Sequence, residues 1–139
     1  MKSFTLCIAT MISLVLLSSQ ACAEQRGWVI SEQDKQFLVA LQVAAQGKKE
    51  DWIASKVSYP LVIHGDTNIT VHDSKEFIEH YDQIMNSKVL MAIEQQRPQD
   101  LFKNVHGLMI GNGEIWFVPV IPDPARPDSL QYYIIAINN

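Results

Sequence analysis

The stretch Val105–Val118, VHGLMIGNGEIWFV, constrains the fold of this chain more than any other part of the sequence. Two runs of aliphatic and aromatic residues, typical of strands, flank a turn sequence centred on Asn112-Gly113. Asn-Gly tolerates positive φ at both central positions of a two-residue turn, and such a turn matches the twist of the strands that it joins. We therefore predict a β-hairpin against which the rest of the chain packs. Its facing pairs should be Ile110 with Ile115 and Leu108 with Phe117.

The first 23 residues have the pattern of a cleavable export signal. Lys2 supplies a positive charge, and the apolar run Phe4–Leu17 is shorter than the ~20 residues that a membrane-spanning helix needs. An Ala-x-Ala sequence at residues 21–23 then predicts cleavage before Glu24. We therefore expect a periplasmic protein whose mature form, residues 24–139, is a single domain.

Lipidation at Cys22 is the alternative to simple cleavage. Ser19 and Gln20 suit it poorly, because a larger aliphatic residue is expected three positions before a lipidated cysteine. The only other cysteine, Cys7, also precedes the predicted cleavage site. The mature chain should therefore have no disulfide, no thiolate nucleophile and no thiolate metal ligand.

The predicted mature chain is acidic. Without Lys2 it has 10 basic and 15 acidic residues, which gives a net charge of −5. This charge argues against nucleic acid or an anionic membrane as a partner. No second long apolar run follows the signal, so we expect no membrane contact in the mature form.

The remaining sequence pattern predicts helices first and long strands last. Ser31 and Asp34 resemble a capping box, apolar residues with helical spacing follow, and Gly47 is expected to end that helix. The other elements expected before the hairpin are a helix over Glu50–Val57, short strands over Leu61–His64 and Ile69–Val71, a helix from Asp73 to Met85, and a helical segment over Lys88–Gln96. After the hairpin, Pro119–Ser129 contains four prolines and should be an exposed loop, and Leu130–Ile137 should be a third long strand.

This order of elements predicts an α+β domain with its helices on one side of an antiparallel sheet. The other side of the hairpin also carries apolar residues, Met109, Trp116 and Val118, although a solvated face should alternate polar with apolar residues. Burial of such side chains favours association by about 25 cal/mol per Å² of apolar area. We therefore expect a homodimer through this face, or another protein partner on it.

Several segments also resemble a known group of proteins. They are HYDQIM at His80–Met85, LF at residues 101–102, GLMIGNGEIWF at Gly107–Phe117, and the terminal IIAINN. Together they are similar to small secreted bacterial proteins of the nuclear-transport-factor-2-like (SnoaL-like, cystatin-related) superfamily, over most of Ser31–Asn139. The resemblance implies a cone in which a bent sheet wraps around about three helices. It does not imply one activity, because this superfamily includes isomerases, dehydratases, cyclases and binding modules.

Enzymes of that superfamily use Asp, His or Tyr side chains that point into the cone, so the resemblance makes certain residues candidates. His80 lies at the edge of the apolar stripe of its helix, Tyr81 lies within the stripe, and His106 shares a face with Leu108 in the predicted strand. These three are the candidate catalytic residues. A ligand in the cone would be expected to contact Tyr59, His80 and Trp116. Each of them also has an ordinary structural explanation, as a core or boundary residue.

Other kinds of chemistry find no support in the sequence. The four histidines lack the spacings of zinc sites, and the chain has no phosphate-binding or dinucleotide-binding glycine loop, so we expect no metal and no cofactor. Two hypotheses remain. The first is an exported binding module, of the inhibitor or immunity type among others, that binds a small hydrophobic ligand or a protein partner. The second is a cofactor-free lyase or isomerase that acts on a small hydrophobic substrate. The absence of a recognisable acid–base pair favours binding.

Overall fold

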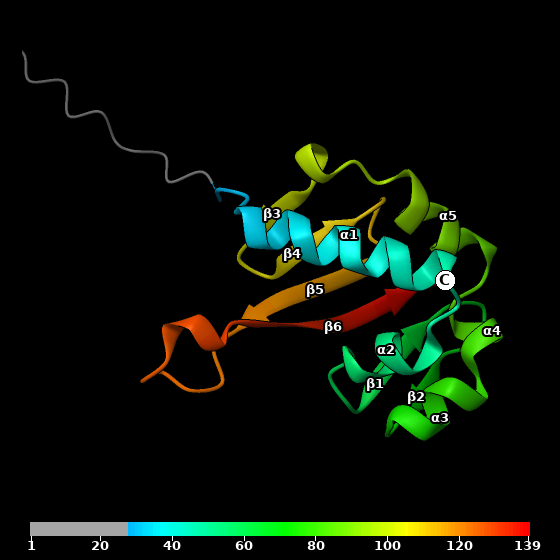
Figure 1. Ribbon diagram of the computed structural model, residues 1–139. Helices are drawn as coiled ribbons and strands as arrows, with labels where there is room; N and C mark the ends of the chain where they lie inside the picture. The colour runs from blue at the N-terminus through cyan, green and yellow to red at the C-terminus, as the bar shows by residue number, and fades with distance from the viewer. Residues whose placement is uncertain (1–27) are drawn as a thin grey trace, which may run out of the picture.

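The computed structural model describes residues 28–139 (Figure 1). The predicted signal peptide and its cleavage site lie outside these residues. The helical elements are α1 (Glu32–Gln46), α2 (Glu50–Ser55), α3 (Ser74–Glu79), α4 (Tyr81–Ile84), α5 (Ser87–Gln95) and the 3-10 turns η1 (Pro98–Asp100) and η2 (Pro127–Ser129). The strands are β1 (Leu61–His64), β2 (Ile69–Val71), β3 (Phe102–Asn104), β4 (Gly107–Ile110), β5 (Ile115–Val120) and β6 (Gln131–Asn138). Among these residues, no helix is both long and apolar enough to cross a membrane.

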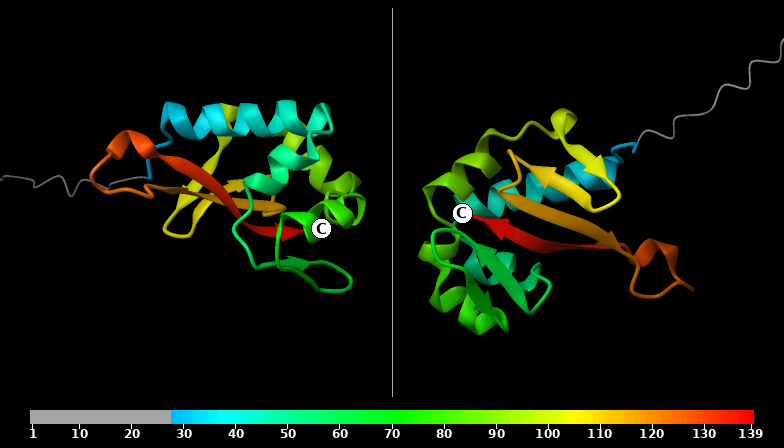
Figure 2. Two further views of the ribbon diagram at one scale, coloured as in Figure 1. Left: turned by 60° about the horizontal axis from the view of Figure 1, so that its bottom comes forward. Right: turned by 180° about the vertical axis from the view of Figure 1, so that it is seen from behind.

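The six strands form one open, bent sheet in the order β2-β1-β6-β5-β4-β3. The helices lie on one side of the sheet and leave its other side uncovered (Figure 2, right). The predicted α+β class, a bent sheet packed against helices, is therefore confirmed. The prediction of a wholly antiparallel sheet is wrong at one place, because β1 and β6 are parallel. Parallel neighbours need a long connection, and here most of the domain lies between the two strands.

The predicted hairpin forms, with the predicted register. β4 pairs with β5 so that Ile110 faces Ile115 and Leu108 faces Phe117. The turn itself differs from the prediction, since positive φ falls on Gly111 (66°) and Gly113 (109°) and not on Asn112.

Two side chains cap this loop. The Glu114 carboxylate accepts the Asn112 N–H at 2.6 Å, and the Gln96 side chain accepts the Gly111 N–H at 2.9 Å. These bonds stabilise a four-residue loop in place of the tighter two-residue turn.

The short strand β3 was not predicted. It pairs with β4 across a short turn that contains Val105 and His106, so neither residue lies in a strand. Gly107 has a φ of 133°, and a Cβ there would lie 2.7 Å from the Phe117 carbonyl oxygen. β5 also continues through Pro119, within the predicted loop. The register places Gly107, the first residue of β4, opposite Val118, so no residue of β4 lies beside Pro119. Proline lacks a backbone N–H, and at this position no hydrogen bond to β4 is lost by it.

A bulge in the β5–β6 pair changes which side chains of β6 face the core. Trp116 pairs with Ala136 but Phe117 pairs with Ile134, so Ile135 is an extra residue. Strict alternation predicted that Ile134 and Ala136 share a face. Instead Ile134 and Ile137 are both fully buried.

The helix boundaries follow local capping. Ser31 and Asp34 form the predicted capping box at the start of α1, and Asp73 caps α3. The helix predicted from Asp73 to Met85 is divided into two, because His80 has a non-helical ψ of 16° between α3 and α4. Gly47 follows the end of α1 as predicted, but the positive φ of 49° falls on Lys48.

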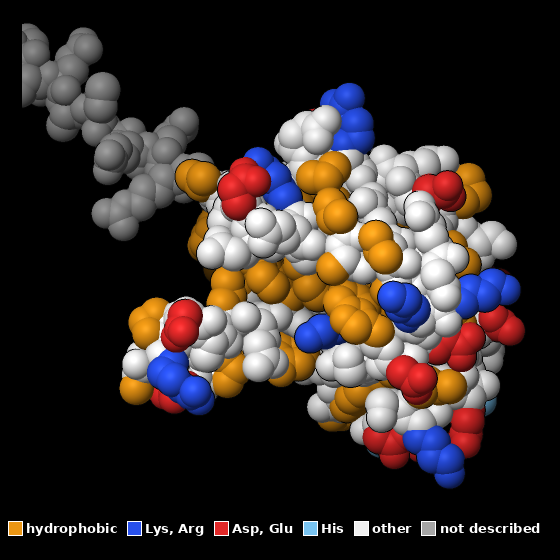
Figure 3. Space-filling model, viewed as in Figure 1, with side chains coloured by type: hydrophobic (Ala, Val, Ile, Leu, Met, Phe, Trp, Pro, Cys, Tyr) orange, Lys and Arg blue, Asp and Glu red, His pale blue; other side chains and the backbone are white. Residues whose placement is uncertain are grey.

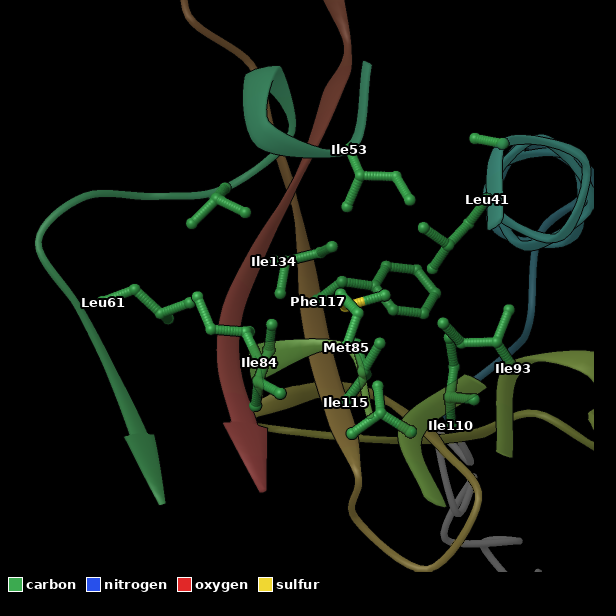
Figure 4. Packing of buried hydrophobic residues seen from close by; sticks show 14 of the residues in the cluster. Leu41, Ile53, Leu61, Ile84, Met85, Ile93, Ile110, Ile115, Phe117 and Ile134 are labelled. Carbon is green, nitrogen blue, oxygen red and sulfur yellow. The ribbon is translucent and has the colours of Figure 1, made fainter. Parts of the chain in front are cut away.

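The interior of the bent sheet is filled with side chains. Leu41 from α1 and Ile53 from α2 point toward Phe117 and Ile134 of the sheet (Figure 4). All four are fully buried, as are Phe77, Ile84, Ile93, Leu108 and Ile110. The space where a cone pocket was expected is therefore occupied by the hydrophobic core.

Candidate functional site

The three residues predicted to bind a ligand lie in different environments. The Tyr59 hydroxyl donates to the Ala54 carbonyl at 2.8 Å, and burial, with a contribution from Asp73, raises the pKa of Tyr59 to about 12. His80 is exposed between α3 and α4. Trp116 lies on the outer face of the sheet, opposite the helices. These side chains do not line one pocket.

The other two candidate catalytic residues are also separate. Tyr81 is buried, and its ring lies 6.1 Å from the Phe77 ring in an edge-on arrangement. Its hydroxyl has no hydrogen-bond partner among the described residues, and burial, followed by the nearby charges of Glu50 and Asp82, raises its pKa. His106 is exposed in the β3–β4 turn and does not share the inner face with Leu108 as predicted.

The predicted interface residues do share one surface. Met109, Trp116 and Val118 are half-buried on the outer sheet face, where Trp116 packs edge-on against Phe102 with ring centroids 6.5 Å apart. Phe102 is 49 % exposed and Ile135 is 40 % exposed. We call the surface formed by these five residues and Tyr133 the outer sheet face.

This outer sheet face is uncharged. Within the six strands the only Asp, Glu, Lys or Arg residue is Lys103. Its ammonium group does not lie on the outer face, because it forms an ion pair with the buried carboxylate of Asp34 on α1 at 2.7 Å. The face is thus both apolar and without charged side chains.

Asp34 is the centre of a polar cluster that the sequence did not reveal. Its side chain is 1 % exposed and accepts hydrogen bonds from the Ser31 N–H at 2.8 Å, the Lys103 ammonium group at 2.7 Å and the Tyr132 hydroxyl at 2.7 Å. Sequence reasoning assigned Asp34 only to helix capping. The chain offers no local signal for the other two contacts, because they come from strands 69 and 98 residues away.

The cluster changes the acidity of its members. Burial alone would raise the pKa of Asp34, but hydrogen bonds from Lys103, the Ser31 backbone and Tyr132 outweigh this and lower it below its ordinary value. Burial, then the hydrogen bond to the Asp34 carboxylate, raises the pKa of Tyr132 to about 12. Asp34 is therefore ionised and Tyr132 is neutral at neutral pH. Because the carboxylate is already bonded to three donors, the cluster is better suited to hold α1 on the sheet than to transfer protons.

A cavity of about 470 Å³ lies beside this cluster, between α1 and the loop that joins β5 to β6. It is lined by Gln33, Gln36, Phe37, Pro127, Asp128, Leu130 and Tyr132. The space-filling view shows hydrophobic side chains in a hollow beneath α1 (Figure 3). We call this cavity the α1 groove.

A larger depression of about 640 Å³ lies between α5 and the β4–β5 loop. Seven of its ten lining residues are polar or charged, Gln96, Arg97, Asp100 and Glu114 among them. Arg97 pairs with Asp100, and Gln96 and Glu114 are bound to the loop backbone. The other polar residues of its lining are Lys88, Gln95 and Asn112.

Within residues 28–139, no three His, Cys, Asp or Glu side chains lie close enough together to hold a metal ion. Comparison with known proteins yields no match to a family model, to a curated protein or to a solved structure.

Proposed function

We propose that this chain is an exported binding module of the nuclear-transport-factor-2-like type, which associates through its outer sheet face, first of all with a second copy of itself. The observation that supports this is the uncharged, apolar character of a sheet face that no helix covers. Contiguous exposed apolar surface on a soluble domain commonly marks a site of protein interaction.

A second copy suits this face for an electrostatic reason. The predicted mature chain carries a net charge of −5, so two copies repel each other over most of their surfaces. The outer sheet face has no charged side chain to oppose contact. It combines the exposed side chains of Phe102 and Ile135 with the half-buried rings of Trp116 and Tyr133, and aromatic residues are enriched at protein interfaces. An inhibitor or immunity role would place another exported protein on the same face.

The filled interior favours this surface over a cone pocket as the place of binding. Leu41, Ile53 and Phe117 occupy the region where a ligand would have to lie. The alternative function, a cofactor-free lyase or isomerase, has less support. His80 and His106 are exposed at separate turns, and a general base needs a partner and a substrate within hydrogen-bond reach.

The test is the oligomeric state of the purified protein, measured by sedimentation velocity over a range of concentrations. The wild type should form a dimer at micromolar concentration. Trp116→Glu should be monomeric and retain its melting temperature, because its side chain is only half-buried within the monomer. Met91→Glu is the matched control, since Met91 is 53 % exposed but lies on α5. A wild type that stays monomeric at high micromolar concentration contradicts the proposal, as does equal dissociation by Met91→Glu.

A further inference from the structure

Aromatic rings form the floor of the α1 groove, and this series of rings extends beyond the groove to Trp52 on α2. Phe37 stacks on Tyr132 with ring centroids 5.0 Å apart and also stacks on Trp52 at 6.2 Å. Phe37 and Tyr132 line the groove itself, and Trp52 lines a smaller cavity of about 250 Å³, together with Ala40. A series of stacked rings bordered by two adjacent hollows suits a flat or linear apolar group.

The two ends of this aromatic series differ in charge. At the Trp52 end, the Lys56 ammonium group lies 5.6 Å from the centre of the indole ring, and Lys49 lines the smaller cavity. Neither lysine forms an ion pair with a described residue, whereas Lys35, Lys75 and Lys103 each do. At the other end, the groove is bordered by two glutamine amides and by Asp128.

We propose that the α1 groove and the adjoining Trp52 surface bind a small free amphiphile with one anionic head group, of the fatty-carboxylate class. The apolar chain lies along Tyr132 and Phe37, and the carboxylate lies at the Trp52 end beside Lys49 and Lys56. The opposite orientation would place the carboxylate beside Asp128, so the charges of the groove select one direction.

The nearby carboxylates are consistent with this orientation. Glu50, the first residue of α2, is half-buried, and its charge is near enough to Tyr81 of α4 to contribute to the raised pKa of that phenol. Asp51 is the other carboxylate at the start of α2 and is exposed. Removal of its charge should leave binding unchanged or tighten it.

This inference does not depend on the proposed association of two copies. The α1 groove lies between α1 and β6 on the helix side of the sheet, and the outer sheet face is on the opposite side. Trp116→Glu should therefore bind the amphiphile as the wild type does, even where it abolishes dimers.

The experiment compares three probes with the same chain and different heads: decanoate, decanol and decyltrimethylammonium, each below its micelle concentration. Binding is measured by calorimetry, and stoichiometry by native mass spectrometry. Decanoate should bind one per chain and about tenfold more tightly than the cation, which is the size expected for two exposed charge contacts. Equal or tighter binding of the cation, or decanoate uptake only when it is part of a vesicle, overturns the proposal.

Variants locate the site. The pair Lys49→Gln and Lys56→Gln together should weaken decanoate about tenfold and leave decanol unchanged. Lys88→Gln is the control, because Lys88 lines the separate depression beside α5. Gln36→Trp should fill the groove from its exposed rim, abolish binding of all three probes and preserve the melting temperature. Undiminished decanoate binding by Gln36→Trp, or by the double lysine variant, would show that the ligand binds elsewhere and that the assignment is wrong.

Discussion

Replacement of Asp34 by Asn tests whether the buried ion pair stabilises the attachment of α1 to the sheet. The substitution preserves the shape of the side chain and removes its charge. The remaining amide oxygen cannot satisfy all three donors that converge on the carboxylate, and its NH₂ group faces one of them. The Lys103 side chain is 18 % exposed, and its ammonium group loses its ion-pair partner and keeps only a 3.3 Å hydrogen bond to the Val29 carbonyl.

The expected loss can be estimated from the burial of the pair. Removal of one partner of a buried ion pair costs about 3–5 kcal/mol, and the partial exposure of Lys103 places this case at about 3 kcal/mol. With a urea dependence of about 2 kcal/mol per molar, the midpoint of unfolding should fall by about 1.5 M with an unchanged slope. Such a loss is a large part of the ~5–15 kcal/mol that stabilises an ordinary domain.

Equilibrium urea unfolding followed by circular dichroism measures this change. Asp100→Asn is the control, because Asp100 pairs with Arg97 at 2.6 Å on an exposed surface and its removal should leave the midpoint unchanged. Adding Lys103→Met to Asp34→Asn should recover part of the loss, since the unpaired ammonium group is replaced by an apolar chain. Equal midpoint shifts in the Asp34 and Asp100 variants would refute the reasoning.

The pH dependence gives a second test of the same cluster. The pKa of Asp34 is lower in the folded protein than its ordinary value of about 3.9. Its contribution is therefore complete above that value and decreases as the pH falls through the folded pKa. The difference in stability between wild type and Asp34→Asn should be largest at neutral pH and smaller below about pH 4. A difference that stays constant into strong acid would mean that the charge of Asp34 contributes nothing.

Three further predictions follow from single contacts. Gly113→Ala should cost about 1 kcal/mol of stability through its positive φ alone. Gly107→Ala should cost more, because its Cβ would lie 2.7 Å from a carbonyl oxygen of β5. Urea midpoints that are equal for the two variants would contradict this. In an alkaline absorbance titration, Tyr132→Phe should remove one phenol that ionises near pH 12, and an unchanged curve near that pH would be inconsistent with the cluster. Asn139→Ala should lower the melting temperature, because the Asn139 side chain donates to the carbonyls of Gln83 and Ile84 at the end of α4; an unchanged melting temperature would mean that these bonds add no stability.

Local chemistry was sufficient to predict most of the elements. The Ser31 capping box, the Asp73 cap and the facing pairs of the β4–β5 hairpin depend on residues within a few positions of each other, so the sequence pattern determines them. The α+β class follows from the order of these elements. The apolar character of the outer sheet face was also evident, because Met109, Trp116 and Val118 interrupt the expected alternation with polar residues.

Contacts between distant segments decided the rest. The β5–β6 bulge exchanges the faces of Ile134 and Ala136, and no local pattern marks the extra residue. The parallel contact of β1 with β6 depends on how the whole chain folds back on itself.

The candidate sites show the same division. The sequence made histidines and tyrosines candidate catalytic residues because of their residue type alone. The fold places His80 and His106 on separate exposed turns. Lys103 and Tyr132 lie 69 and 98 residues from Asp34 in the chain, yet the fold brings both within hydrogen-bond distance of its carboxylate. By itself the sequence determined where most of the helices and strands form, because the caps, turns and apolar spacing that mark them are short-range properties. Only the tertiary structure decided which polar groups share a buried environment, since that depends on packing between residues far apart in the chain.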